Sequence, residues 1–269
     1  MTKAKQLESS TDKIIIQITD THLLKDPKEE FVQVNPEHGF HAVMDDIRKN
    51  FPHIDAIIHT GDLAQNAKTE TYQRYLDYMQ QFAVPFFQVP GNHDDIEKFP
   101  FATALPEPTV VDLGAWQIIL LNSAVTGKID GWFDHEHLER LDTLLENNQD
   151  RHVILACHHH PFSMHSKWID QHILKNTTDL KQILSKYNHV KLVVFGHVHQ
   201  ESVNAWHNTE FLSTPSTFVQ FKPRSDDFAF DDIAPGYRCL HLKSDGQYST
   251  KVYRLKDYNP KINKEISGY

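Results

Sequence analysis

The sequence predicts an α/β fold in which helices cover mixed β-sheets. Between residues 13 and 200, short apolar runs alternate with segments whose apolar residues recur at helical spacing. Beyond residue 200, polar and apolar residues alternate along short segments, as in antiparallel strands and hairpins. The length of 269 residues allows a substantial core, and no internal repeat or linker divides the chain. We therefore expect a single domain over residues 13–269.

The individual elements follow this order along the chain. Six short apolar runs predict strands, and the first of them, KIIIQIT, is typical of a buried strand. The predicted strands span residues 13–19, 55–60, 85–89, 116–123, 152–157 and 191–195. The predicted helices span residues 41–51, 69–82, 135–148 and 177–187. Leucines at 138, 141, 144 and 145 share one face of the third helix, and Asp134 is placed to cap its start.

The two ends of the chain differ in character. Residues 1–12 are polar and are expected to form a poorly ordered lead-in. The later part of the chain predicts antiparallel strands, and Asp245-Gly246 is typical of a hairpin turn. These later strands are expected at residues 201–207, 209–213, 237–243 and 247–254.

Composition narrows the class of function. The chain has 36 acidic and 27 basic residues, and the net charge of -9 argues against a general nucleic-acid or membrane-surface binder. A small-molecule substrate is favoured instead, and bound metal ions would supply positive charge for an anionic one. The only cysteines, Cys157 and Cys239, form neither a disulfide framework nor a CxxC site. With no signal-like or membrane-spanning apolar run, the sequence predicts a cytoplasmic protein.

Side chains that can bind metal ions follow five of the predicted strands directly. They are Asp20 with His22, Asp62, Asn92 with His93, His158, and His197 with His199. A lone Asp after a strand is usually a turn residue or a helix cap, and a lone His is usually solvated or part of the core. Loops at the ends of the strands of an α/β sheet meet at one edge, however, so five such clusters favour one shared site.

The types of ligand also indicate the kind of site. Carboxylate, imidazole and amide oxygen suit Mn, Fe, Zn or Co, and the lack of thiolate argues against a closed structural zinc site. Seven candidate ligands are too many for one catalytic ion with an open position. Two ions are therefore expected, with the Asp62 carboxylate as the bridge between them.

At these residues the sequence resembles the calcineurin-like metallophosphoesterase superfamily. The five matching blocks are DTH (20–22), GD (61–62), GNHD (91–94), HH (158–159) and GHVH (196–199). The segments QITDTHL, TGDLAQ, HHHP, WIDQH, TPSTFVQFKP and IAPGYR look more like one group in that superfamily, the bacterial cyclic-AMP phosphodiesterases called CpdA. The resemblance implies the metallo-dependent phosphatase fold, a four-layer α/β/β/α sandwich of two mixed sheets flanked by helices.

The resemblance also implies a ligand set for each of two divalent metal ions. One ion would be held by Asp20, His22, Asp62 and His199, and the other by Asp62, Asn92, His158 and His197. Iron, manganese or both are expected, with zinc and cobalt as alternatives. His159 and His160 are expected to be loop residues held by local hydrogen bonds, and Cys157 to point into the sheet.

The expected activity is hydrolysis of 3′,5′-cyclic AMP to 5′-AMP by in-line attack of a metal-bridging hydroxide. His93 is expected to bind the phosphate and to protonate the leaving ribose oxygen, with Asp94 orienting it. The expected substrate-binding residues are His22, Asn92, His93, Trp168 and His199. Trp168 could stack on a purine or simply pack within its loop.

Two alternatives remain at this stage. The first is a metallophosphoesterase of other specificity, such as a glycerophosphodiesterase, a nucleotide phosphatase or a broad phosphodiesterase. The second is a non-catalytic scaffold of the same fold, which would be expected to have lost ligands. The sequence predicts neither an oligomeric state nor the role of the region after residue 200.

Overall fold

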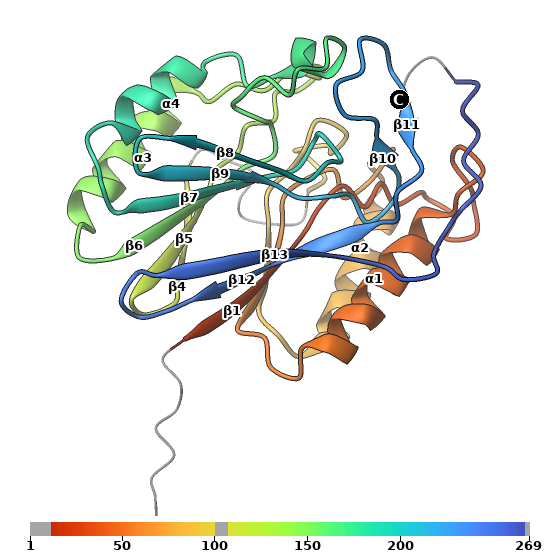
Figure 1. The fold of residues 1–269 in the computed structure, drawn as a ribbon, viewed down its shortest axis with the longest axis horizontal. Coiled ribbons are helices and arrows are strands. Elements are labelled where there is room, and N and C mark those ends of the chain that lie inside the picture. Colours follow the sequence, from red (N-terminus) through yellow and green to blue (C-terminus); the bar gives the residue numbers. More distant parts are fainter. Residues whose placement is uncertain (1–11, 100–106, 267–269) are drawn as a thin grey trace, which may run out of the picture.

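Two β-sheets lie face to face, and helices cover both outer faces (Figure 1). The computed structural model describes residues 12–99 and 107–266. Helices α1 and α2 lie on one side of the sandwich and α3 and α4 on the other. The expected four-layer α/β/β/α order is therefore confirmed. Except for Asp12, the expected lead-in at residues 1–12 lies outside the described residues.

The first sheet joins segments from both ends of the chain. Its strands are β1 (Lys13–Ile18), β2 (Ala56–His59), β3 (Phe86–Gln88), β12 (Gly236–Leu242) and β13 (Tyr248–Arg254). In the order β13-β12-β1-β2-β3, strands β1, β2 and β3 run parallel, and β12 pairs antiparallel with both β1 and β13. Figure 1 shows the blue hairpin of β12 and β13 beside the red strand β1. The predicted antiparallel hairpin is confirmed, and it extends the parallel part of the sheet.

The second sheet is built mainly from the middle of the chain. Its strands are β4 (Thr109–Asp112), β5 (Trp116–Leu120), β6 (His152–Ala156), β7 (Val190–Phe195), β8 (Ser202–Trp206) and β9 (Thr209–Ser213). Strands β5, β6, β7 and β9 run parallel in that order, whereas β4 and β8 pair antiparallel at the two edges. Strand β4 was not predicted, nor was the short ribbon of β10 (Gln220–Phe221) and β11 (Phe230–Asp231).

The helices agree with the predicted ones except at their ends. They are α1 (Pro36–Asn50), α2 (Thr69–Met79), α3 (His135–Asn147) and α4 (Thr177–Leu184), with 3₁₀ turns at Gln80–Phe82 and Ile169–His172. Helix α1 begins before residue 41, because Asn35 caps it by accepting from His38 N at 2.8 Å and Pro36 fits its first turn. Asp134 does occupy the cap position of α3, but its side chain makes no capping hydrogen bond. Among the described helices, none is both long and apolar enough to cross a bilayer.

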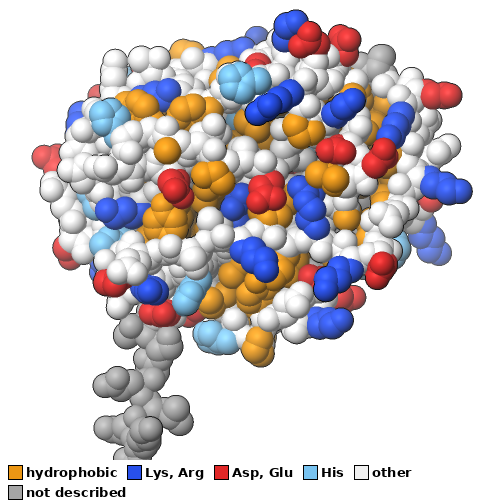
Figure 2. Space-filling model, viewed as in Figure 1, with side chains coloured by type: hydrophobic (Ala, Val, Ile, Leu, Met, Phe, Trp, Pro, Cys, Tyr) orange, Lys and Arg blue, Asp and Glu red, His pale blue; other side chains and the backbone are white. Residues whose placement is uncertain are grey.

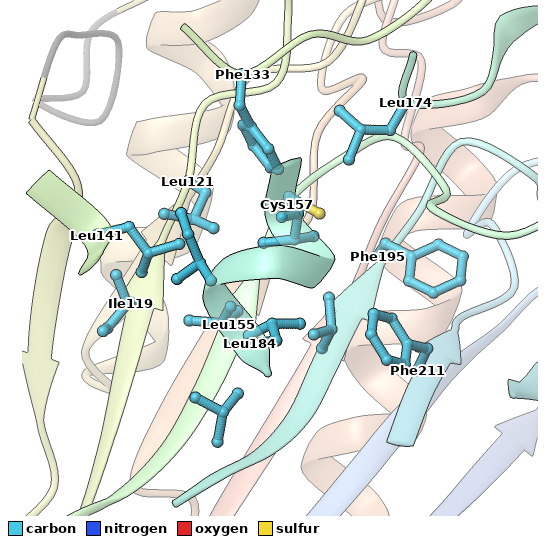
Figure 3. Packing of buried hydrophobic residues seen from close by; sticks show 14 of the residues in the cluster. Ile119, Leu121, Phe133, Leu141, Leu155, Cys157, Leu174, Leu184, Phe195 and Phe211 are labelled. Atoms are coloured by element: carbon cyan, nitrogen blue, oxygen red, sulfur yellow. The ribbon is translucent and has the colours of Figure 1, made fainter. Parts of the chain in front are cut away.

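Three apolar layers hold the sandwich together. Ile15 and Ile58 pack between the two sheets, whereas their neighbours Ile16 and Ile57 face α1 and α2. A third layer lies between the second sheet and the helices α3 and α4, as Figure 3 shows. The central strands are thus buried on both faces, which explains why their sequences are almost continuously apolar.

The outer surface has a different composition. On the face drawn in Figure 2, Lys and Arg side chains are scattered among Asp and Glu side chains. The charges on this face are therefore interspersed rather than gathered into a patch of one sign.

Candidate metal centre

Five loops at the carboxyl ends of β1, β2, β3, β6 and β7 meet at one edge of the sandwich. The main chain joins them directly, because Asp20 N donates to Gly61 O at 3.0 Å and Gly196 N donates to His158 O at 3.1 Å. These loops bring together all of the predicted ligands: Asp20, His22, Asp62, Asn92, His158, His197 and His199. Except for the half-buried Asn92, each of these side chains is buried.

Five of the ligands have a left-handed backbone. The φ angles are 52° at Asp20, 47° at His22, 52° at Asp62, 68° at His197 and 47° at His199. This conformation costs a non-glycine residue about 1–2 kcal/mol, so the surrounding structure must hold it in place. It also explains how His197 and His199, which are only two residues apart, can both face one site. In a flat strand they would face opposite sides, whereas here the chain has left β7 and turns.

The first group of ligand atoms comes from the loops after β1 and β7. His22 Nε2 lies 3.2 Å from His199 Nε2, and His199 Nε2 lies 3.4 Å from Asp20 Oδ1. His22 Nε2 lies 4.0 Å from the same Asp20 oxygen. These three side chains have the spacing of ligands around a single ion.

The second group comes from the loops after β3, β6 and β7. His158 Nε2 lies 3.1 Å from Asn92 Oδ1 and 3.2 Å from His197 Nδ1. Asp62 lies between the two groups, since its Oδ2 is 3.7 Å from His22 Nε2 and 3.3 Å from His158 Nε2. One carboxylate oxygen therefore faces both groups, which is the position of a bridging ligand.

The outer nitrogens of three imidazoles show that a cation fits here. His158 Nδ1 donates to Thr60 O at 2.8 Å, His199 Nδ1 donates to Val219 O at 2.7 Å, and His22 Nδ1 lies 2.6 Å from Gln65 Oε1. A carbonyl oxygen only accepts, so the hydrogen of each neutral ring is assigned to Nδ1 and the Nε2 lone pair points inward. Lone pairs and carboxylate oxygens thus converge on the same space, as in sites where outer hydrogen bonds orient metal ligands.

Electrostatics favour the same occupant. Burial raises the pKa of Asp62, but the charge of His158 and its hydrogen bond to Asp62, together with His93, outweigh burial and hold that pKa well below the usual value. Burial lowers the pKa of His22 and His197 far below the usual value, which favours the neutral form that binds metal. Burial also lowers the pKa of His158, yet Asp62 and Asp20 reverse the shift and raise it to about 9, so a metal ion that binds His158 Nε2 must displace a proton from this nitrogen. The carboxylates therefore draw positive charge to this position.

Three glycines of the sequence blocks allow the loops to approach this closely. A Cβ atom on Gly61 would collide with the His158 ring, one on Gly91 with Asp62, and one on Gly196 with Thr19 and Asp20. Gly61 also has φ 96°, which side-chain-bearing residues rarely adopt. Each glycine is thus needed where a loop passes directly behind a ligand.

The family follows from the sequence comparison. The model of the calcineurin-like phosphoesterases matches residues 14–201. The chain belongs to the calcineurin-like phosphoesterase family. The 3′,5′-cyclic adenosine monophosphate phosphodiesterase CpdA of Escherichia coli K12 is 39% identical over 259 residues, which cover 95% of this chain and 94% of that protein. A 3′,5′-cyclic-nucleotide phosphodiesterase of Nostoc is 35% identical and covers 90% of this chain and 92% of its own length.

Solved structures of low sequence identity share the fold of this calcineurin-like phosphoesterase. A dimetal phosphatase from Danio rerio superimposes with a TM-score of 0.61 at 12% identity, covering 88% of this chain and 98% of that chain. A purple acid phosphatase from yellow lupin gives a TM-score of 0.59 at 15% identity, covering 91% of this chain and 54% of its own. These neighbours confirm the expected metallo-dependent phosphatase fold.

His93 and Asp94 differ in what they contact. His93 N donates to Asp62 Oδ1 at 2.8 Å, and its ring Nδ1 lies 3.2 Å from Gln65 O. The Asp94 carboxylate accepts from four donors, namely Gly91 N at 2.9 Å, Leu63 N and Ala64 N at 3.2 Å each, and Tyr72 OH at 3.0 Å. These bonds fasten the GNHD loop to the GD loop and to α2, and none of them reaches the His93 ring, so the role of Asp94 in orienting that ring stays a prediction.

The other residues of the HHHP run have local partners. His159 Nδ1 lies 2.8 Å from Ser123 Oγ, and its Nε2 donates to Ile129 O at 3.0 Å, as expected for a loop residue held by hydrogen bonds. His160 Nε2 lies 3.5 Å from Asp170 Oδ1, and its ring stacks on His197 at 5.4 Å. Cys157 points into the apolar layer beneath α3 and α4 (Figure 3), where burial raises the pKa of its thiol to about 12.

A pocket of about 560 Å³ opens beside the ligands of this family member. Its lining includes Asp62, Asn92, His93, His197 and His199 and the aromatic rings of Trp168, Phe221 and Phe228. The Trp168 ring meets Phe221 and Phe228 edge-on at 5.0 Å each, while Phe221 stacks on His199 at 4.0 Å. The two phenylalanines were not identified from the sequence. Nothing in the sequence distinguishes Phe221 and Phe228 from other phenylalanines, because they reach the pocket only when the segment around β10 and β11 folds.

Proposed function

We propose that the protein is a phosphodiesterase with two divalent metal ions that hydrolyses 3′,5′-cyclic AMP to 5′-AMP. The observation that carries this proposal is the pair of ligand groups facing one Asp62 oxygen, beside a pocket with an aromatic wall. The substrate class comes from the relatives, which are named as cyclic-nucleotide phosphodiesterases over nearly their whole lengths. A scaffold protein would not need all seven ligands, so that alternative is disfavoured.

Two sets of residues would hold the two metal ions that act on the phosphate. Two divalent ions in such a site activate water and neutralise charge on the phosphoryl group. Asp20, His22, Asp62 and His199 would hold one ion, and Asp62, Asn92, His158 and His197 the other. Carboxylate and imidazole ligands without thiolate fit iron or manganese, with zinc or cobalt as alternatives. The two cysteines are both buried and unpaired, which fits the reducing cytoplasm.

His93 is placed to act on the leaving group. Its main-chain contact to Asp62 keeps it beside the metal ligands, and its ring lines the pocket. Its Nδ1 is directed to Gln65 O, and we assign to Nε2 the contact with the phosphate and, from the protonated ring, the transfer of a proton to the ribose oxygen. Asn92 and His199 are included in the proposed substrate contacts because they line the same pocket. His22 is also included, although it does not line the pocket, because its ring lies 5.0 Å from that of His93 and 5.1 Å from that of His199.

The test of this function is a comparison of substrates. Protein stripped by a chelator is reloaded with Mn²⁺ or Fe²⁺ and assayed for kcat/KM on 3′,5′-cyclic AMP, 3′,5′-cyclic GMP, 2′,3′-cyclic AMP and a glycerophosphodiester. We expect activity only after reloading and the highest kcat/KM for 3′,5′-cyclic AMP. A higher value for another diester would replace the substrate while leaving the metal centre in place. Reloaded protein without activity on any phosphate ester would contradict the proposal as a whole.

The aromatic wall gives a prediction about the base. Replacing Trp168 by Leu should raise KM for 3′,5′-cyclic AMP by about 5- to 150-fold, since stacking of one base on an aromatic ring contributes about 1–3 kcal/mol. A small diester without a base should be affected much less. Trp132→Leu is the matched control, because Trp132 lies 47% exposed beside another pocket. If KM rises equally for both substrates, Trp168 supports the site by packing and does not contact the base.

A further inference from the structure

A buried amide crosses the layer between the two sheets directly behind the metal centre. Gln17 lies in β1, two residues after Ile15 and therefore on the same face of the strand, which packs against the second sheet. Its side chain is 0% exposed at the end of a mainly apolar layer. A buried amide is costly unless it is hydrogen-bonded, so its partners are informative.

The amide of Gln17 joins three strand ends. Its Nε2 donates to Thr60 Oγ1 at 2.9 Å, just after β2, and to Phe195 O at 3.2 Å, at the end of β7. Its Oε1 accepts from Thr214 Oγ1 at 2.6 Å, just after β9. Thr60 precedes Asp62 by two residues and Phe195 precedes His197 by two. One side chain of the first sheet thus binds both sheets at the points where the ligand loops begin.

The direction of each hydrogen bond is fixed by a second buried side chain. Arg238, opposite Gln17 in the register of β1 and β12, is 1% exposed and donates through Nε to Thr214 Oγ1 at 3.1 Å. An arginine only donates, so the Thr214 hydroxyl accepts there and gives its own hydrogen to Gln17 Oε1. The amide nitrogen must then face Thr60 and Phe195. The hydrogen bonds therefore have only one possible direction: Arg238 donates to Thr214, Thr214 donates to Gln17, and Gln17 donates to Thr60 and Phe195.

This arrangement matters because each ligand group draws on both sheets. Asp20, His22, Asp62 and Asn92 follow strands of the first sheet, whereas His158, His197 and His199 follow strands of the second. The carbonyl of Thr60 also accepts from His158 Nδ1 at 2.8 Å, so the residue that Gln17 holds in turn orients a ligand of the other sheet. Any shift between the sheets would change the distances within both groups.

We propose that Gln17 is a positioning residue that sets the two sheets in register for metal binding, with Thr214 and Arg238 orienting its amide. The inference rests on the metal centre proposed above but not on the identity of the substrate. It assigns to Gln17 no contact with substrate or with the ions.

The test is Mn²⁺ binding to metal-free protein in the absence of any substrate, followed by electron paramagnetic resonance. Gln17→Met keeps the size of the side chain and removes all three hydrogen bonds. We expect Mn²⁺ affinity to fall by about 10- to 100-fold, the usual effect of changing a residue that supports metal ligands. The matched control is Gln117→Met on β5, a glutamine that is 3% exposed and packs away from the site. It should leave Mn²⁺ affinity unchanged, whatever its effect on Tm.

Thr214→Val separates positioning from general loss of stability. It removes the link to Gln17 Oε1 but leaves both bonds of Gln17 Nε2, so a smaller fall in Mn²⁺ affinity is expected. Combined with Gln17→Met it should add little, because both changes break one network. Affinity loss in Gln17→Met no greater than in Gln117→Met would overturn the proposal. If Gln17→Met does not fold, unchanged affinity in Thr214→Val would overturn it instead. Wild-type protein that binds two Mn²⁺ ions without cleaving cyclic AMP would refute the substrate and leave this inference intact.

Discussion

Asp62→Asn should lose both metal ions and lower phosphodiester hydrolysis by at least about 10³-fold. The Asp62 Oδ2 atom faces both groups of ligands, at 3.7 Å from His22 Nε2 and 3.3 Å from His158 Nε2. Asparagine keeps the shape but removes the charge that both ions share. Metal ions contribute several kcal/mol to the stabilisation of such a reaction, and each 1.36 kcal/mol corresponds to a factor of ten in rate. Metal content by mass spectrometry and kcat with cyclic AMP measure the two effects.

The control for this variant is Asp112→Asn. Asp112 carries an exposed carboxylate paired with Arg151, far along the chain from any ligand loop, so its loss should change neither metal content nor kcat. If Asp62→Asn retains two ions as tightly as the wild type, Asp62 is not the bridge. Loss of a single ion would place Asp62 in one ligand group alone.

His93→Ala should leave metal content unchanged and lower kcat for cyclic AMP by about 10²–10⁴-fold, the usual contribution of general acid catalysis. The ring lies in the pocket and meets the His22 ring edge-on at 5.0 Å, whereas the hydrogen bond to Asp62 comes from the main-chain nitrogen, which alanine preserves. The ribose alkoxide is a poor leaving group that needs a proton. A nitrophenyl diester has a leaving group that is stable as an anion, so its hydrolysis should be much less impaired.

The comparison of the two leaving groups decides the role of His93. An equal loss on both substrates would limit His93 to binding the phosphate, and unchanged turnover of cyclic AMP would remove it from the reaction. His135→Ala provides the control, because this histidine is 88% exposed at the start of α3. It should match the wild type on both substrates.

The sequence predicted those features that require particular types of side chain at particular positions. A strand buried on both faces is apolar over most of its length, and KIIIQIT was recognised for that reason. The leucines of α3 mark the face that packs on the second sheet. The ligands were found because they follow strands at one edge of the sandwich, where loops from both sheets meet.

Other features do not depend on the type of side chain and could not be predicted in this way. The alternation of residues in β9 is the same whether it pairs parallel or antiparallel, so its parallel pairing with β7 was not foreseen. Strand β4, with four residues, is too short to show a pattern. The carbonyl groups of Thr60 and Val219 orient two ligands through the main chain, which any residue could supply. The Asp94 carboxylate was assigned by proximity in sequence, but its partners come from another loop and from α2.

The pairing of β1 with β12 has a consequence for biosynthesis. Ile15 pairs with Leu240, so β1, which leads to Asp20, remains without one of its two neighbours until Leu240 has left the ribosome. At roughly 5–20 residues per second, translation takes on the order of ten to fifty seconds to reach that point. During this interval the nascent chain exposes an unpaired, strongly apolar edge, which makes it a natural client for chaperones.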